Sequence, residues 1–354
     1  MDPAAPPEDD PPGTVRRVVA TGVIAALVVL ASVTGFWFAT GSGPFAAIEP
    51  SWWALDMTEI TALHDRALNG TGVTVCIVDT GVDMDHPELR HVNLVGWRDL
   101  VNGRPKPYDD EGHGTAMAGI IFARGRIPGV APGADLIAVK AIGPTGTGQD
   151  LDIAAAVSYC ADPNADRDLT DGAEVISLSL GGRPHPLGTA ADAAVDRAMR
   201  AGVIVVAAAG NDGRSDDGDV QSPASVANVV AVGAVDRQGV IAPFSSRGRN
   251  DGSVPRSDPN KKPEVVAPGL EIATLLPGGS YAYVSGTSPA SALVAGIVAL
   301  LLDEHPEYRH QATWLQLLKQ ALMFGACDCA GPAVPHDTLY GYGIVKGLAT
   351  NALL

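Results

Sequence analysis

The chain has 354 residues, of which 46% are hydrophobic and 5% aromatic, and its formal net charge is −16. This length permits one large α/β domain with a short appendage, and the composition is that of a globular protein rather than a disordered or fibrous one. The acidic balance argues against a nucleic-acid-binding surface and is explained by solubility alone.

The first 50 residues divide by composition into three segments. Residues 1–17 are rich in Pro and Asp and end in two arginines, residues 18–40 carry no charge, and residues 41–50 are typical of a linker. A bilayer core needs about 20 apolar residues, whereas the apolar part of a signal peptide has about 7–15. We therefore expect a disordered cytoplasmic N-terminus followed by a single-pass transmembrane helix or signal-anchor, with cleavage of a signal peptide and secretion as the alternative. The arginines predict that residues 51–354 lie outside the cytoplasm, at the cell membrane.

Beyond residue 50, apolar runs of strand length alternate with segments of helical composition. Strands are predicted at 73–78, 136–141, 175–180, 203–208 and 229–235, and helices at 114–123, 149–161, 189–201, 289–303 and 312–324. Continuous apolar strands separated by helices predict a mainly parallel sheet covered on both faces. A dinucleotide-binding enzyme would share this architecture, but Asp79-Thr80-Gly81 follows the first strand where such an enzyme has Gly-x-Gly-x-x-Gly.

Three motifs stand where parallel sheets collect functional groups, at strand C-termini and helix N-termini. Val-Asp-Thr-Gly-Val-Asp contains Asp79, Gly-His-Gly-Thr-Ala contains His113, and Ser-Gly-Thr-Ser-Pro-Ala contains Ser288. Singly, these residues are an ordinary turn residue, a polar residue at a helix start and a helix N-cap. Together they supply a hydroxyl nucleophile, a base and a carboxylate that orients the base.

The order Asp, His, Ser with these flanking glycines resembles the subtilisin, or subtilase, family of serine peptidases. Other segments that resemble family landmarks are Ser-Leu-Gly-Gly at 179–182, Ala-Ala-Ala-Gly-Asn at 207–211, Phe-Ser-Ser-Arg-Gly at 244–248, Val-Val-Ala-Pro-Gly at 265–269 and Gly-Tyr-Gly at 341–343. The resemblance implies the subtilisin-like three-layer α/β fold for residues 51–354, and a cofactor-free endopeptidase that works through an acyl-enzyme.

The resemblance also implies roles for individual residues. Asp79, His113 and Ser288 would form the catalytic triad, and the side-chain amide of Asn211 would donate to the oxyanion. The polypeptide substrate would lie as an extended strand between two edges. The residues expected to contact it are Ser179, Leu180 and Gly181 on one edge, Gly146 and Gly148 on the other, and Gln221 at the base of the pocket for the residue before the scissile bond (P1). If the loop 212–221 folds differently, Gln221 points to solvent instead.

Some features depart from the family pattern and favour an alternative function, a catalytically silent subtilase fold used as a binding module. Pro289 stands where the family usually has Met, and Ala292 where it usually has Pro, although neither change removes a catalytic atom. The segment between the N-terminal apolar stretch and the first strand is too short for the propeptide of many secreted subtilases. The sequence does not indicate an oligomeric state.

No metal site is expected. The segment 120–133, where secreted relatives carry a calcium loop, contains no acidic residue, which disfavours a hard cation. Glu88 stands where family members often place a ligand carboxylate, so weak calcium dependence is the expectation.

The four cysteines are too few for a disulfide framework in a chain of this length. Cys76 lies in an apolar run and is predicted to be a small core residue. Cys327 and Cys329 are too close in sequence for an easy mutual bridge.

Overall fold

The computed structural model describes residues 48–213, 218–249, 254–326 and 336–354. The predictions for the N-terminal segments lie outside these residues, apart from the last three residues of the linker. Cys327 and Cys329 also lie outside them.

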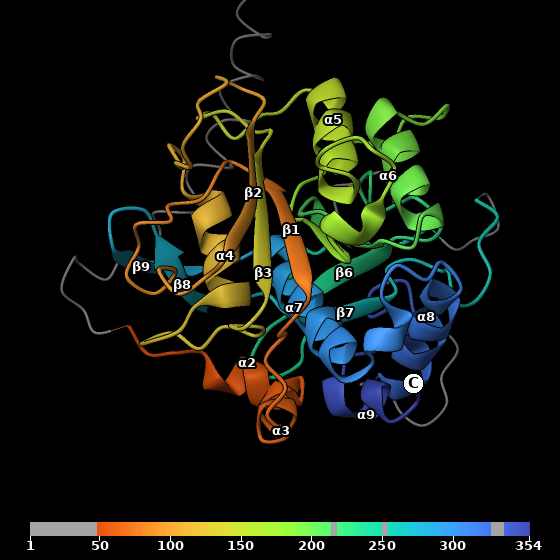
Figure 1. The fold of residues 1–354 in the computed structure, drawn as a ribbon. Helices are drawn as coiled ribbons and strands as arrows, with labels where there is room; N and C mark the ends of the chain where they lie inside the picture. Colours follow the sequence, from red (N-terminus) through yellow and green to blue (C-terminus); the bar gives the residue numbers. More distant parts are fainter. Residues whose placement is uncertain (1–47, 214–217, 250–253, 327–335) are drawn as a thin grey trace, which may run out of the picture. The chain divides into compact units, whose positions relative to one another are not determined.

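A seven-stranded parallel sheet forms the centre of the described domain, in the order β2-β3-β1-β4-β5-β6-β7 (Figure 1). The strands are β1 (Thr74–Asp79), β2 (Leu94–Asp99), β3 (Asp135–Lys140), β4 (Val175–Leu178), β5 (Ile204–Ala208), β6 (Val230–Val235) and β7 (Val265–Pro268). All except the edge strand β2 are almost wholly buried, which accounts for their continuous Val, Ile and Ala runs. The parallel sheet predicted from the sequence is confirmed.

The longer helices cover both faces of this sheet. They are α4 (His113–Phe122), α5 (Asp150–Ala161), α6 (Ala190–Arg200), α7 (Thr287–Glu304) and α8 (Trp314–Gly325). On one face α4 packs against α7, and on the other α5 packs against α6 (Figure 1). Within the described ranges, α7 is the one helix long and apolar enough to cross a membrane, but 83% of it is buried in the protein. A helix that is apolar all round and buried in this way is a core helix.

The predicted strands and helices begin and end within two residues of the observed ones, whereas several shorter elements were not predicted. These are β2, β7, the antiparallel hairpin of β8 (Ile272–Leu276) and β9 (Ser280–Val284), and the short helices α2 (Trp52–Met57), α3 (Ile60–His64) and α9 (Gly347–Asn351). Strand β2 was missed because it is half exposed and its register shifts after Leu94, so its residues alternate irregularly.

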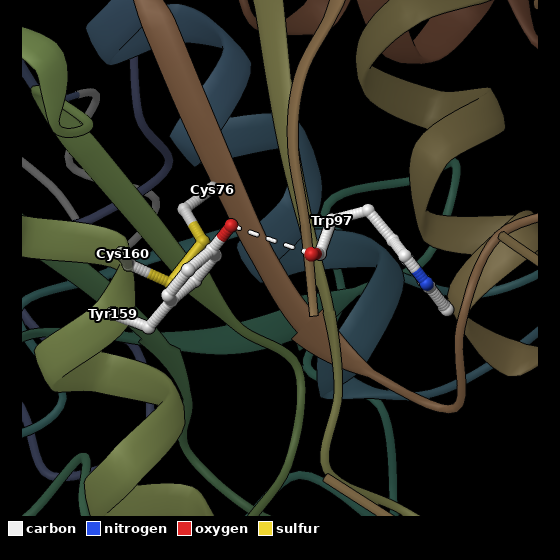
Figure 2. The surroundings of a disulfide bond; sticks show 4 residues. All are labelled: Cys76, Trp97, Tyr159 and Cys160. Atoms are coloured by element: carbon white, nitrogen blue, oxygen red, sulfur yellow. Dashed lines mark hydrogen bonds between the residues drawn. A yellow bond between two sulfur atoms is a disulfide. The ribbon is translucent and has the colours of Figure 1, made fainter. Parts of the chain in front are cut away.

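A disulfide joins Cys76 in β1 to Cys160 near the end of α5 (Figure 2). Both cysteines are fully buried and their Cα atoms are 5.8 Å apart, an ordinary separation for a disulfide. Next to it, the hydroxyl of Tyr159 donates to the carbonyl oxygen of Trp97 in β2, at 3.3 Å. The prediction that Cys76 is a core residue agrees with its burial, but its bonded partner was missed because the two cysteines are 84 residues apart in sequence.

Candidate active site

The candidate site lies at the carboxyl edge of the sheet, where the neighbouring strands β1 and β4 end together. Ile77 pairs with Ser177, so Asp79 and Ser179, two residues further along, stand at the same level. Asp79 is the last residue of β1 and only 1% exposed. The nucleophile, base and carboxylate predicted from the sequence would therefore meet around these two strand ends.

Asp79 and His113 are in direct contact. The Nδ1 atom of His113 lies 2.8 and 2.9 Å from the two carboxylate oxygens of Asp79. Because an ionised carboxylate can only accept, Nδ1 is the protonated nitrogen and Nε2 is left as the basic one. The structure thus brings together two of the three residues predicted for the triad, in the arrangement that an orienting carboxylate and a base require.

Close packing of α4 on β1 depends on the glycine after His113. A Cβ atom on Gly114 would lie 2.0 Å from the carbonyl oxygen of Gly81 and 3.1 Å from the Cβ of Asp79. Only glycine lets the first turn of α4 come this close to the strand end. The Gly-His-Gly motif therefore sets the approach of His113 to Asp79.

The charge environment of His113 favours its protonated form. Burial opposes a charge there and by itself would lower the pKa of His113. The carboxylate of Asp79 acts in the opposite direction through its charge and its hydrogen bond, and Glu111 and Asp109 add to it, so that the pKa of His113 is raised to about 9. His113 is therefore a stronger base than a free histidine, and its neutral form, which can accept a proton, becomes the major one only as the pH rises past that pKa.

Ser288 is the second residue of α7 and is hydrogen-bonded to Ser179, just after the end of β4. Its Oγ donates to the carbonyl oxygen of Ser179 at 3.1 Å, and the Ser179 hydroxyl donates back to the carbonyl oxygen of Ser288 at 3.2 Å. The hydroxyl of Ser291, one turn further along the helix, donates to the same Ser288 carbonyl at 2.9 Å. The start of α7 is thereby fixed at the strand edge that the sequence predicts to bind substrate.

Asn211 follows β5 and lies beside the start of α7. Its Oδ1 accepts hydrogen bonds from the backbone N–H and the hydroxyl of Thr287, at 2.8 and 3.0 Å. A Cβ atom on Gly286 would lie 3.4 Å from Asn211 Nδ2. With Oδ1 held by Thr287, the amide Nδ2 is the donor that Asn211 offers next to Ser288.

The residues predicted for the two substrate edges lie at the end of β4 and in the loop that follows β3. Ser179, Leu180 and Gly181 continue β4, and the next residue, Gly182, pairs with Ser222. On the other side, Gly148 bridges to Ile142 and Gly146 turns the chain with φ of +71°. A Cβ atom on Gly146 would lie 3.8 Å from Glu111 Oε1, so this loop adjoins the segment that leads to His113.

Gln221 lies between the end of β5 and the continuation of β4. Its Nε2 donates to Asp212 Oδ2 at 2.6 Å, and a Cβ atom on Gly181 would lie 2.6 Å from its Oε1. A Cβ atom on Gly210 would lie 2.6 Å from its Cγ. The side chain is half-buried against these glycines, and its amide bonds to Asp212 at an exposed position.

Glu88, the carboxylate considered as a calcium ligand, is bonded to protein donors. The carboxylate of Glu88 accepts from the backbone N–H groups of Arg126 and Ile127, both at 2.9 Å, and from the Tyr281 hydroxyl at 2.7 Å. Both oxygens are thus held by protein donors where a metal ligand would need to face the ion. Elsewhere the carboxylates of Asp162, Asp166 and Asp171 lie within 4.8 Å of one another in a surface loop. Such exposed acidic groups are common without a metal, and we assign none.

Known proteins match this chain over most of its length. A family model described as "Subtilase family" matches residues 70–343. The chain is 35% identical to Subtilisin Savinase of Lederbergia lenta over 302 residues, which cover 84% of this chain and 98% of that protein. It is 37% identical to Subtilisin E of Bacillus subtilis (strain 168) over 300 residues, 83% of this chain and 69% of that protein. M-protease of Shouchella clausii (strain KSM-K16) is 35% identical over 302 residues, 84% and 69% of the two chains.

Proposed function

The chain belongs to the subtilase family and is a serine-type endopeptidase, and from this premise we propose that Asp79, His113 and Ser288 form its catalytic triad. The observation that carries the proposal is the double contact of His113 Nδ1 with the Asp79 carboxylate, at 2.8 and 2.9 Å. This contact fixes the tautomer in which Nε2 can take a proton from a hydroxyl. Ser288, half-buried at the start of the core helix α7, is the hydroxyl proposed to give it up.

In the proposed reaction, His113 removes the Ser288 proton as Oγ attacks the carbonyl carbon of a peptide bond. Asp79 orients the imidazole and stabilises its cation. The developing oxyanion is bound by Asn211 Nδ2 and by the backbone N–H of Ser288 at the helix start, where the partial positive charge of the helix end assists. The imidazolium then protonates the leaving amine, and water, deprotonated by His113, hydrolyses the acyl-enzyme to the free acid and Ser288.

The residues at the start of α7 that differ from the usual family pattern, Pro289 and Ala292, remove no group that this reaction uses. Pro289 lies in the first helical turn, where a backbone N–H has no partner within the helix and its loss costs little. A silent binding module, the alternative, has no need for the contact between Asp79 and His113. A fluorophosphonate probe separates the two functions: we expect labelling of Ser288, and an unlabelled, folded protein would favour the binding module.

Substitution of Asn211 tests the oxyanion hole. Asn211→Leu is expected to lower kcat by roughly 10²–10³, a magnitude known from the corresponding change in subtilisin itself, with little change in KM. Because Asn211 Oδ1 also holds Thr287, Asn211→Asp is the matched variant: it retains an oxygen for Thr287 but replaces the donor by an acceptor. Both variants should lose kcat. If Asn211→Asp keeps wild-type kcat, the amide is not the oxyanion donor.

Gln221 is proposed to shape the preference at P1. An aromatic ring placed against its amide would disrupt the bond to Asp212, and an unpaired buried amide costs about 1–3 kcal/mol. The exposed charge of Asp212 adds a bias of about 0–1 kcal/mol towards a basic side chain. We expect small, polar or basic P1 residues to exceed Phe and Tyr in kcat/KM, measured on peptides that differ only at P1. Gln221→Gly should raise the relative rate for Phe; if Phe or Tyr is best in the wild type and Gln221→Gly changes nothing, the pocket lies elsewhere.

We propose that residues 18–40 tether the domain to the cell membrane, with residues 51–354 outside the cytoplasm. Two observations support this topology: the arginine pair before the apolar segment, and the Cys76–Cys160 disulfide, a bond that persists mainly in oxidising compartments. Protease treatment of intact cells should digest residues 51–354 while a cytoplasmic marker survives. Full protection until lysis would contradict this topology, and release of the domain into the medium would favour cleavage and secretion.

A further inference from the structure

Asp109 lies four residues before His113 and accepts hydrogen bonds with both carboxylate oxygens. Its Oδ1 accepts from the backbone N–H groups of Glu111 and Gly112, at 3.1 and 2.8 Å. Its Oδ2 accepts from the backbone N–H and the hydroxyl of Thr115, at 2.9 and 2.6 Å. One half-buried carboxylate thus holds the chain on both sides of His113.

The same carboxylate reaches Asp79 through Thr80. The Thr80 hydroxyl donates to Asp109 Oδ1 at 2.9 Å and accepts from the backbone N–H of Gly114 at 2.8 Å. The backbone N–H of Thr80 in turn donates to Asp79 Oδ1 at 2.7 Å. Thr80 is only 1% exposed, so water does not compete freely for these bonds. Asp109 is therefore connected to both members of the Asp79–His113 pair.

We propose that Asp109 is a positioning residue for peptide hydrolysis. Its carboxylate accepts hydrogen bonds from Thr80 and from the turn 111–115, and these bonds set the orientation of His113 relative to Asp79. This inference rests on the triad proposed above. No atom of Asp109 is assigned to the substrate or to the proton transfer. Displacement of a catalytic group by about 1 Å can lower the rate 10²-fold, so loss of the positioning by Asp109 should be measurable as a fall in kcat.

The charge of Asp109 provides a second readout. Three ionisable groups act on His113 against the effect of burial: Asp79 from β1, and Asp109 and Glu111 from the turn before α4. Each of them raises the pKa of His113. Loss of the negative charge at Asp109 should therefore lower that pKa. A residue that only supports the fold would change the melting temperature or the fraction of active protein, but not this pKa.

Asp109→Asn tests the proposal. The amide keeps an acceptor for Thr80 but turns a donor towards Thr115, whose backbone N–H is then unpaired. We expect kcat per fluorophosphonate-titrated active site to fall about 10- to 100-fold with KM nearly unchanged. The acid limb of kcat/KM should move to lower pH. Asp65→Asn is the control, because it removes one exposed carboxylate just after helix α3. It should change neither kcat nor the position of the acid limb.

Thr80 offers an independent pair of variants should Asp109→Asn fail to fold. Thr80→Val removes the hydroxyl that joins Asp109 to Gly114 at nearly constant volume, and Thr80→Ser retains it. We expect Thr80→Val to lose kcat, Thr80→Ser to stay near wild type, and Thr80→Val with Asp109→Asn to be less than additive. The proposal is overturned if Asp109→Asn leaves both kcat and the acid limb of kcat/KM unaltered while Ser288→Ala is inactive. It is overturned equally if Thr80→Val differs from Thr80→Ser in neither quantity. Activity in Ser288→Ala would instead overturn the triad itself.

Discussion

Replacement of Ser288 by alanine is expected to abolish peptide hydrolysis without unfolding the protein. Loss of the serine nucleophile lowers kcat by about 10⁶-fold in subtilisin itself, and we expect a loss of that order here. The fold should survive because the bonds from Ser179 and Ser291 go to the Ser288 backbone oxygen, which alanine keeps. The substitution removes the bond from the Ser288 hydroxyl to the Ser179 carbonyl.

Casein hydrolysis and the melting temperature measure the two parts of this prediction separately. Ser158→Ala removes an exposed hydroxyl on α5 that bonds only its own helix, and serves as the matched serine-to-alanine control. Wild-type casein cleavage by Ser288→Ala would exclude Ser288 as the nucleophile. A large fall in its melting temperature would mean that the lost activity does not identify a catalytic group.

Much of the site could be predicted because its residues stand at the ends of regular elements. Asp79 closes a buried strand, and His113 and Ser288 open helices whose apolar residues are unmistakable in the sequence. Where a strand of a parallel sheet ends, the position of its last residue follows from the topology alone. The direct contact between Asp79 and His113 is the geometry expected of such neighbours.

The residues that sequence reasoning missed act through contacts that no local pattern encodes. Asp109 stands in an acidic turn, Asp-Asp-Glu, where the sequence alone does not distinguish it from the acid beside it; its bonds to Thr80 and Thr115 do. The pairing of Cys76 with Cys160 likewise appears only when α5 is packed on β1. In both cases the side chain is ordinary and its partner is distant in the sequence, so the role becomes visible only in the folded chain.

The second large effect is expected for Asp79→Asn. An asparagine amide opposite Nδ1 favours the wrong imidazole tautomer, a change that costs about 10⁴-fold in kcat in a serine peptidase of a different fold. The same substitution should alter the pH dependence of the residual activity. His113 must be neutral to act as a base, so kcat/KM rises as the pH passes through its pKa, which burial would lower but Asp79 raises to about 9.

Removal of the Asp79 charge leaves burial as the dominant influence on His113, so the acid limb of kcat/KM should move to lower pH in Asp79→Asn. Stability should follow the same linkage. A pKa raised from 6.5 to about 9 on folding stabilises the wild type fully below pH 6.5, and this contribution is lost as the pH rises towards 9. The difference in unfolding free energy between wild type and Asp79→Asn should therefore shrink over that interval.

These expectations are checked by pH–rate profiles on a fluorogenic peptide and by denaturant unfolding at pH 6 and pH 9.5. The double variant Asp79→Asn with Ser288→Ala gives the background hydrolysis that must be subtracted from so slow an enzyme. Asp65→Asn controls for the loss of one negative charge from the protein as a whole. An acid limb that stays in place, or moves to higher pH, would show that Asp79 does not set the protonation of His113, and the contact between them would then be structural rather than catalytic.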